Sequence, residues 1–170
     1  PILSVISPLF SSYSTVLEIG SGTGQHAIYF AEKMPHLTWH TSDCASYLDG
    51  IKLWLDAAAL PNTVLPFELN VSTSKWPEIE VEAIFSANTL HIMHHADMVN
   101  LISAAGSRLK SGNSMVIYGP FNYKGHYTSD SNERFDGWLR DRDPLSGIKH
   151  FEEINQLSNQ SGIQLITDYE

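Results

Sequence analysis

A glycine-rich stretch near the start of the chain carries the first chemistry that the sequence suggests. Residues 16–26 read as an apolar strand that runs through Glu18 into a loop with Gly20, Gly22 and Gly24, and then into a helix. Gly20 and Gly22 permit positive φ and leave no Cβ between backbone and ligand, and we expect Gly24 to let the helix pack close to the strand. Such a loop directs backbone N–H groups at a polar ligand. The pattern predicts a loop that binds a nucleotide-type cofactor.

The spacing of these glycines distinguishes between cofactors. A dinucleotide-binding loop has the pattern G-x-G-x-x-G, whereas Gln25 stands here in the place of the third glycine. This departure disfavours an NAD-type oxidoreductase. Ser21 and Thr23 complete the loop, and Gln25 and His26 at the helix start are candidate helpers in binding a carboxylate. A purely structural glycine turn is the alternative, because a single motif of this kind is weak.

Asp43 is a second candidate ligand residue. It follows the second expected strand and lies 23 residues after Gly20. A carboxylate at that distance can accept hydrogen bonds from both hydroxyls of a ribose. The alternative is an aspartate that caps the next helix, which the preceding Ser42 would also suit. Given the glycine loop, we favour ribose binding.

Polar residues after the fourth expected strand are candidates for contact with a substrate. Asn88 and His91 follow that strand, and His91 is the preferred general base because histidine titrates near neutral pH. The alternative is a histidine that shapes the loop by hydrogen bonding. His91, His94 and His95 would share a helix face, as metal ligands do, but no carboxylate has a matching spacing. We therefore expect no metal, and solvent-facing histidines at a helix start.

Residues 119–130 form a polar stretch that is rich in aromatic side chains and has no expected helix or strand. Phe121 and Tyr123 can form the wall of a substrate pocket, and His126 can lie on a lid over it. The alternative is that these aromatic side chains only fix the loop to the domain. We favour the pocket.

The segment that follows is expected to be structural. Arg140, Arg142 and Asp143 can bind an anionic substrate, but a capping and ion-pair network after a helix is the favoured role. Phe135 and Trp138 stand at helical spacing and are expected in the core.

Short apolar segments alternate with helical patterns along the chain, and this alternation predicts the fold class. Pro66 places the third strand at a sheet edge. The expected strands are Val16–Ile19, Leu37–Ser42, Val64–Leu69, Val81–Ala87, Ser114–Tyr118 and Ile163–Tyr169, and the helices cover about 25–34, 48–58, 98–109, 132–140 and 151–160. Strands that alternate with helices form an α/β fold with a parallel sheet and right-handed crossovers. Ligands in such sheets bind outside the carboxyl ends of the strands.

The composition restricts the class of partner. The 170 residues carry a net charge of −9 with 17% charged residues, and no run of basic residues supports nucleic-acid binding. No apolar run has the length of a membrane span. The single cysteine, Cys44, permits no disulfide within the chain, which fits a reducing compartment and a cytoplasmic location. We expect Cys44 to be a small packed thiol.

The stretch Glu18–Gly24 resembles the first motif of the S-adenosylmethionine (SAM) methyltransferases, E-x-G-x-G-x-G. In many of these enzymes an aspartate and an aliphatic residue after the third strand contact the adenine; here Asn70 and Val71 stand in that place, and the Asn70 carbonyl oxygen can still accept from the adenine amino group. The resemblance implies cofactor contacts from Glu18, Gly20, Ser21, Gly22, Thr23, Gly24, Gln25, Asp43, Asn70 and Val71.

The chain also resembles a narrower family, the small methyltransferase-like proteins typified by methyltransferase-like protein 26. The resemblance covers almost the whole chain. It is carried by Leu17–His26, Pro35–Trp39, Asp43, Asn88, His91-Ile92, Tyr118–Phe121, Gly125–Ser129, Ser131-Asn132, Phe135-Asp136, Trp138-Leu139, Arg142–Pro144 and Gly147-Ile148. The block from Gly125 to Ile148 is its most specific part.

This resemblance implies a Rossmann-like class I methyltransferase fold, a three-layer sandwich with a mostly parallel sheet, in one domain over residues 1–170. It implies SAM as cofactor and a small-molecule substrate, with a non-catalytic interaction module as the alternative. The chain departs from the family at His94-His95. The class I fold normally ends in an antiparallel strand beside the fifth. We expect this chain to lack that strand and to be truncated at both termini.

Overall fold

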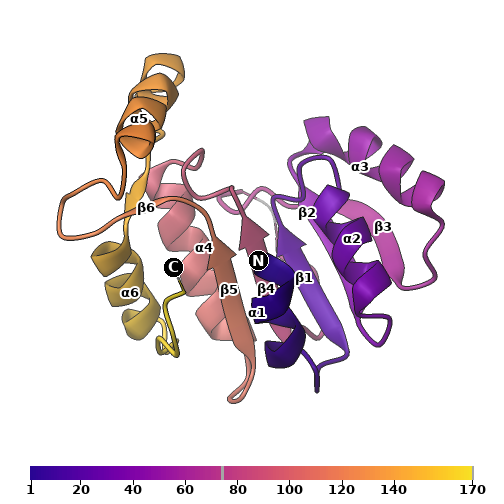
Figure 1. Cartoon of the computed structure of the whole chain (residues 1–170). Helices are drawn as coiled ribbons and strands as arrows, with labels where there is room; N and C mark the ends of the chain where they lie inside the picture. Colours follow the sequence, from indigo (N-terminus) through magenta and orange to yellow (C-terminus); the bar gives the residue numbers. More distant parts are fainter. Residues whose placement is uncertain (74, 170) are drawn as a thin grey trace. The chain divides into compact units, whose positions relative to one another are not determined.

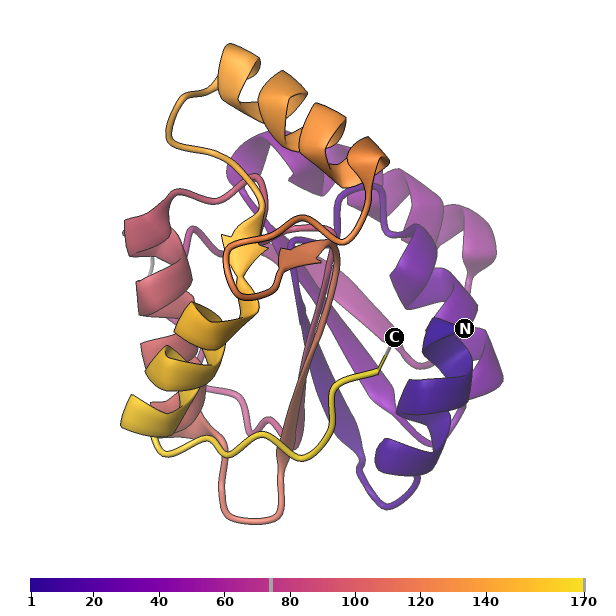
Figure 2. The same ribbon diagram turned by 60° about the vertical axis from the view of Figure 1, so that its left-hand side comes forward.

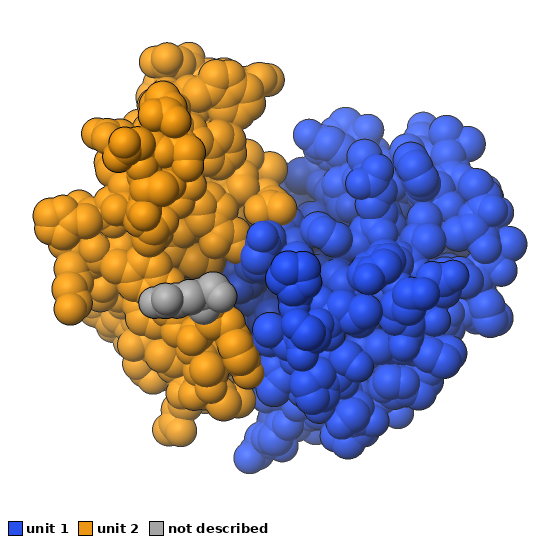
Figure 3. All heavy atoms as spheres, in the orientation of Figure 1, with its two compact units in different colours: residues 1–87, 109–118 blue, residues 88–108, 119–170 orange. Residues whose placement is uncertain are grey.

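The computed structural model describes residues 1–73 and 75–169. The chain divides into two compact units, which Figure 3 shows in different colours. The first unit contains residues 1–87 and 109–118, and the second contains residues 88–108 and 119–170. The expectation of one domain over the whole chain stays a prediction.

A parallel sheet forms the centre of the first unit (Figure 1). Among the described residues its order is β3-β2-β1-β4-β5, and each neighbouring pair is parallel. The strands are β1 (Thr15–Ile19), β2 (Thr38–Asp43), β3 (Thr63–Glu68), β4 (Ala83–Ala87) and β5 (Ser114–Tyr118). The predicted α/β Rossmann-like fold is confirmed. Because the strand order reverses at β1, the carboxyl end of this strand is where such folds bind ligands.

Strand β3 lies at one edge of the sheet, as Pro66 predicts. The register between β2 and β3 shifts between His40 and Ser42, whose partners are Val64 and Phe67. A proline has no N–H to donate to a ladder, so the shift and the edge position accommodate it.

Three helices cover one face of this sheet, as Figure 2 shows. They are α1 (Ile2–Leu9), α2 (Gln25–Lys33) and α3 (Ala45–Ala58). Helix α1 is missing from the sequence-based assignment, although Ile2, Ile6 and Leu9 have helical spacing, because it is short and contains Pro8. The buried side chains on this face are Ile6, Phe10, Val16, Ala27, Phe30, Ala31, Met34, Leu37, Trp39, Ile51, Leu55, Ala83, Phe85 and Ala87.

The second unit consists mainly of helices. They are α4 (His95–Arg108), α5 (Asp130–Arg142) and α6 (Phe151–Gln160), and α4 packs against α6. Strands β6 (Phe121–Asn122) and β7 (Lys149–His150) form a short parallel pair. The loop expected over 119–130 therefore contains a strand that two residues are too short to signal by periodicity. In the part of the chain that the structure describes, no helix has the length and apolar character needed to cross a membrane.

The last expected strand is wrong. Residues 163–169 adopt neither strand nor helix, and the side chains of Leu165 and Ile166 are 51% and 75% exposed. The segment has alternating apolar residues, but an isolated strand is not stable without a neighbour to complete its ladder.

Two expected core residues lie at the surface. Trp138 is 50% exposed, and its ring stacks on the half-buried Phe135 at 5.9 Å while the Arg142 guanidinium lies 4.6 Å from its centroid. A cation over an aromatic ring stabilises a tryptophan that remains in contact with water. Cys44, the N-cap residue that precedes α3, is also exposed rather than packed.

Candidate functional site

The glycine loop after β1 has the backbone that its sequence predicts. Gly20, Gly22 and Gly24 have φ values of 72°, 60° and 83°, a region that strongly favours glycine. A Cβ on Gly22 would meet nothing within 4 Å, so the loop leaves open space there. A Cβ on Gly24 would lie 3.4 Å from Ile51 Cγ2. The atoms nearest to such a Cβ belong to α3, and the expected role of Gly24 in packing the helix against the strand stays a prediction.

Hydrogen bonds to the end of β2 hold this loop in place. The backbone N–H groups of Gly20 and Ser21 both donate to Ser42 O at 3.0 Å. Ser42 N donates to Ser21 Oγ at 3.2 Å, and Ser42 Oγ donates to Glu18 O at 2.7 Å. These bonds fix the first half of the loop against the neighbouring strand.

Glu18 supports the loop from inside the fold. Its side chain is 1% exposed, and its Oε2 accepts from Ser21 Oγ at 3.1 Å and from Trp39 Nε1 at 3.0 Å. Burial raises the pKa of this carboxyl to about 7, with a smaller contribution from the charge of Asp43 and against the two hydrogen bonds. Because it is so buried, Glu18 supports the loop from within through its bond with Ser21.

Asp43 connects the loop to the start of α3. Its Oδ2 accepts from Gly22 N at 2.8 Å, and its Oδ1 accepts from Cys44 N at 2.7 Å. Cys44 occupies the N-cap position of α3, so Asp43 is not the capping residue that the alternative required. Burial raises the pKa of Asp43, against the two backbone hydrogen bonds. Each carboxylate oxygen keeps a further lone pair that can accept from a ligand hydroxyl.

The other predicted cofactor residues differ in their environment. Thr23 and Gln25 are exposed, while the half-buried His26 ring stacks on Phe30 at 5.5 Å. Burial lowers the pKa of His26, so its imidazole is neutral at neutral pH.

Asn70 and the half-buried Val71 follow β3 after one intervening residue. Asn70 Oδ1 accepts from Ser72 N at 3.0 Å in a local turn.

In the second unit, Asn88 directly follows β4 and Gly119 directly follows β5. Asn88 is exposed and has a φ of 54°, which is uncommon for a residue other than glycine. A Cβ on Gly119 would lie 3.9 Å from Asn88 Cα and Oδ1. Such backbone conformations concentrate at functional sites.

His91 is 8% exposed, and the edge of its ring meets Phe135 at a centroid distance of 5.1 Å. Burial, with a contribution from the Lys149 charge, lowers the pKa of His91. The imidazole is therefore neutral at neutral pH, which is the form that accepts a proton. His91 O also accepts from Gly147 N at 2.8 Å, so the residue shapes its loop as well.

The residues predicted to line a substrate pocket after β5 differ in their contacts. Tyr123 stacks on Phe151 at 5.0 Å and donates to Asp168 Oδ2 at 2.9 Å, as expected of a residue that fixes the loop. Phe121 is half-buried in β6. His126 is exposed and closes a turn with Tyr123 through reciprocal backbone hydrogen bonds of 3.0 and 2.9 Å.

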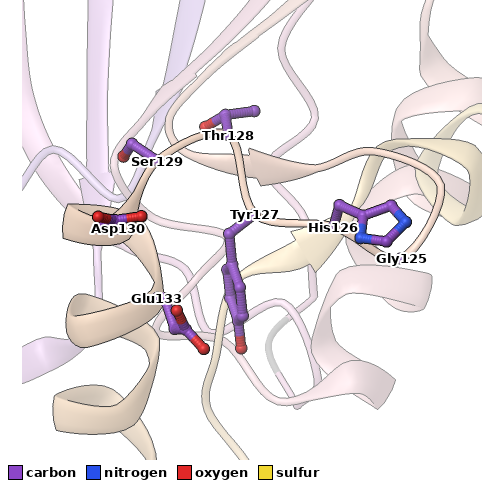
Figure 4. A pocket seen from close by; sticks show the side chains of 7 residues that line it. All are labelled: Gly125, His126, Tyr127, Thr128, Ser129, Asp130 and Glu133. Atoms are coloured by element: carbon purple, nitrogen blue, oxygen red, sulfur yellow. The ribbon is translucent and has the colours of Figure 1, made fainter.

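A pocket does lie in this region, lined by residues 125–130 and Glu133. Figure 4 shows these side chains, with the His126 ring pointing away from Tyr127 and Glu133. Phe121 and Tyr123 do not line this pocket. Their assignment as a substrate wall stays a prediction.

His94 and His95 each bind a separate carboxylate. His94 Nε2 lies 2.7 Å from Asp143 Oδ2, and His95 Nε2 lies 2.7 Å from Glu153 Oε1. Within residues 1–73 and 75–169, no group of three or more His, Cys, Asp and Glu side chains is arranged to hold a metal ion. The two histidines are thus surface residues near the start of α4.

Asp136 is a residue whose importance the sequence reasoning missed. Its side chain is buried at 1% exposure, with Oδ2 accepting from Tyr127 Oη at 2.8 Å and from Arg140 Nε at 2.9 Å. The ion-pair role predicted for Arg140 is confirmed by its partner Asp136, and Asp143 contacts His94. The spacing of Asp136 and Arg140 by four residues on one helix was the available signal.

Several solved structures have a fold similar to that of this chain. An O-methyltransferase family protein from Burkholderia thailandensis matches 95% of this chain and 50% of its own, with a TM-score of 0.84 and 17% identity. PigF with SAH matches 90% of this chain and 46% of its own, with a TM-score of 0.80 and 13% identity. An O-methyltransferase family 2 protein from Planctomyces limnophilus in complex with apigenin matches 87% and 44%, with a TM-score of 0.76 and 14% identity.

At these low sequence identities, the matches establish a similar fold and nothing further. The chain spans about half the length of these solved structures. A family model described as "Protein of unknown function (DUF938)" matches residues 1–170.

Proposed function

Since this chain belongs to the DUF938 family, its chemistry has to be read from its own residues, and we propose that it is a SAM-dependent methyltransferase acting on a small molecule. One observation carries the proposal: three glycines with positive φ follow β1, and the carboxylate at the end of β2 accepts from the N–H of Gly22. This arrangement unites a loop open to a ligand with an acceptor for ribose hydroxyls.

The residues of the first unit fit SAM. The open space beside Gly22 leaves room for the ligand against the loop backbone. The N–H groups of Gly20, Ser21, Gly22 and Gly24 already donate within the protein, so in the proposal the start of α2 binds the methionine carboxylate. In the proposal Asp43 accepts from the ribose hydroxyls, Asn70 and Val71 contact the adenine, and Ser21, Thr23 and Gln25 complete the contacts. Glu18 is a positioning residue that acts through Ser21.

The proposed catalytic work of the protein is modest. SAM supplies an electrophilic methyl group on an excellent leaving group, so the protein needs mainly to align the nucleophile and exclude water. In the proposal, His91 takes the proton from a methyl-accepting group that must lose one, because the His91 imidazole is neutral. Asn88 orients the acceptor from the end of β4.

The substrate class follows from the charge balance and from the similar structures. A net charge of −9 does not favour nucleic acid, and one similar structure holds apigenin. We therefore place a small molecule in the acceptor role.

A relationship to methyltransferase-like protein 26 and a cytoplasmic location belong to the same proposal. The first rests on the sequence resemblance and the second on the single cysteine.

Turnover on a panel of phenols, carboxylates, thiols and amines tests the function. S-adenosylhomocysteine (SAH), the demethylated product, is measured for each acceptor. We expect one class to give SAH above background, and the His91→Asn variant to lower that rate by roughly 10²–10⁴-fold. His150→Asn is the matched control, because His150 is exposed and makes no side-chain capping bond. Binding of SAM without turnover of any acceptor would favour a non-catalytic interaction module instead.

A further inference from the structure

Residues 88–94 form the His91 loop, and residues 143–149 form a short segment that we name the clamp segment. The clamp segment bonds to four consecutive residues of the His91 loop, residues 91–94. Gly147 N donates to His91 O at 2.8 Å, and His94 Nε2 meets Asp143 Oδ2 at 2.7 Å. The carbonyls between them are occupied in the same way: Ser146 Oγ donates to Ile92 O at 3.0 Å, and Lys149 Nζ donates to Met93 O at 2.7 Å. The clamp segment therefore fixes the backbone that carries His91.

Asp136 holds the clamp segment in turn. Its Oδ1 accepts from Ile148 N at 2.5 Å, in a buried position. A Cβ on Gly147 would lie 2.8 Å from both Asp136 Oδ1 and Arg140 Nη2, and Gly147 has a φ of 143°. Only glycine allows this approach, so the clamp segment is fitted against the carboxylate.

The other oxygen of Asp136 holds the loop before α5. Tyr127 Oη donates to Oδ2 at 2.8 Å, and the Tyr127 side chain lines the pocket of residues 125–130 and 133 (Figure 4). One buried carboxylate thus joins the pocket loop by one oxygen and the clamp segment by the other.

The charge of Asp136 fits this arrangement. Burial acts to raise its pKa, but the hydrogen bonds from Arg140, Ile148 N and Tyr127 together hold the pKa below its ordinary value. The carboxyl is therefore ionised at neutral pH. The bond to Asp136 also raises the pKa of Tyr127, so the phenol remains a donor.

The geometry points to Asp136 as the positioning residue of the substrate side: it couples Tyr127 to the backbone of His91 through the clamp segment. The inference rests on the proposed role of His91 in the proposed methyl transfer. It extends that function by assigning a role to a residue that lies outside both the cofactor loop and the expected substrate contacts. A change at Tyr127 should therefore reach the Gly147–His91 bond, which Tyr127 does not itself make.

The test measures amide hydrogen exchange at Gly147 and the NMR titration of the His91 imidazole. Asp136→Asn should speed exchange at Gly147 at least about tenfold, since local opening follows the loss of buried contacts, and should move the His91 titration toward that of an exposed histidine. Asp141→Asn is the matched control, because it removes the same charge from an exposed site on the same helix. Exchange at Gly147 equal in both variants would overturn the inference.

The Tyr127→Phe variant distinguishes the coupling of Tyr127 to the Gly147–His91 bond from a general loss of stability. It also provides the test if Asp136→Asn fails to fold. It removes one hydroxyl from a side chain that is 38% exposed. We expect it to speed exchange at Gly147 by roughly threefold, and to add nothing in an Asp136→Asn background, as a double-mutant cycle requires of a shared path. Tyr47→Phe on α3 is its control. Gly147 exchange and His91 titration unchanged in Tyr127→Phe would contradict the coupling.

These readouts stand apart from the proposed function. They need neither SAM nor an acceptor, so a wild-type protein that fails to bind SAM would refute the methyltransferase while leaving the coupling measurable. An uncoupled Tyr127 in a protein that does bind SAM would refute only the role of Asp136.

Discussion

At the scale of single residues, Glu18 and Asp43 share the work of holding the glycine loop. The buried Glu18 carboxylate accepts a hydrogen bond from Ser21 Oγ, whereas the half-buried Asp43 carboxylate accepts one from Gly22 N. A carboxyl that is buried loses the favourable hydration of its charge, and its pKa rises in consequence. The loop is therefore supported by one buried carboxyl with a pKa raised to about 7 and by one carboxyl that is partly exposed.

The pH dependence of stability should report Glu18. Its pKa is raised by burial to about 7, so the native state binds a proton that the unfolded state releases near pH 4.5. Its contribution is complete below the unfolded pKa and is lost as the pH rises through the folded pKa. From pH 5 to pH 8 we expect wild type to lose at most roughly 3 kcal/mol relative to Glu18→Gln.

Thermal unfolding at both pH values measures this difference. Glu68→Gln, at an exposed position on β3, is the control and should keep the pH profile of wild type. Parallel profiles for wild type and Glu18→Gln would show that the buried carboxyl does not titrate in this window.

At the scale of elements, the sequence predicts what is long and periodic. Helix α6 is predicted with its observed bounds, Phe151–Gln160, and β5 likewise. The short pair β6 and β7 has too few residues for a period to appear. The strand expected over 163–169 shows the opposite failure, because alternation of apolar residues cannot reveal whether a neighbouring strand exists.

Two glycines, Gly24 before α2 and Gly50 within α3, should respond in opposite directions to an added methyl group. Gly24 has positive φ, and its Cβ would make an ordinary van der Waals contact with Ile51, whereas Gly50 lies inside α3 with nothing within 4 Å. We expect Gly24→Ala to lower the free energy of unfolding by about 1–2 kcal/mol. Gly50→Ala should raise it by about 0.5–1 kcal/mol, because alanine has the better helix propensity.

Urea denaturation of both variants checks this pair, with each serving as the reference for the other. If Gly24→Ala were as stable as wild type, the left-handed backbone of the loop would not be required for folding.

At the scale of the whole molecule, the sequence predicts the fold, and it offers more candidate residues for the proposed cofactor site than for the proposed substrate site. The proposed cofactor residues are adjacent in the sequence or follow strands at a regular interval, so spacing alone proposes Gly20–Gly24 and Asp43. The network around Asp136 joins Tyr127 to Ile148 by contacts that no local period encodes. Residues of that kind become visible only when the packing of the second unit is known.

The most direct test of the account is calorimetric titration of the whole chain with SAH and, separately, with NADH. We expect SAH to bind and NADH not to bind. Asp43→Asn should weaken SAH binding by about ten- to a hundredfold, the cost of a charge-assisted hydrogen bond. Asp49→Asn, an exposed change on α3, should leave it unchanged. No binding of SAH at millimolar concentration, or tighter binding of NADH, would contradict the assignment of the glycine loop and Asp43 to SAM.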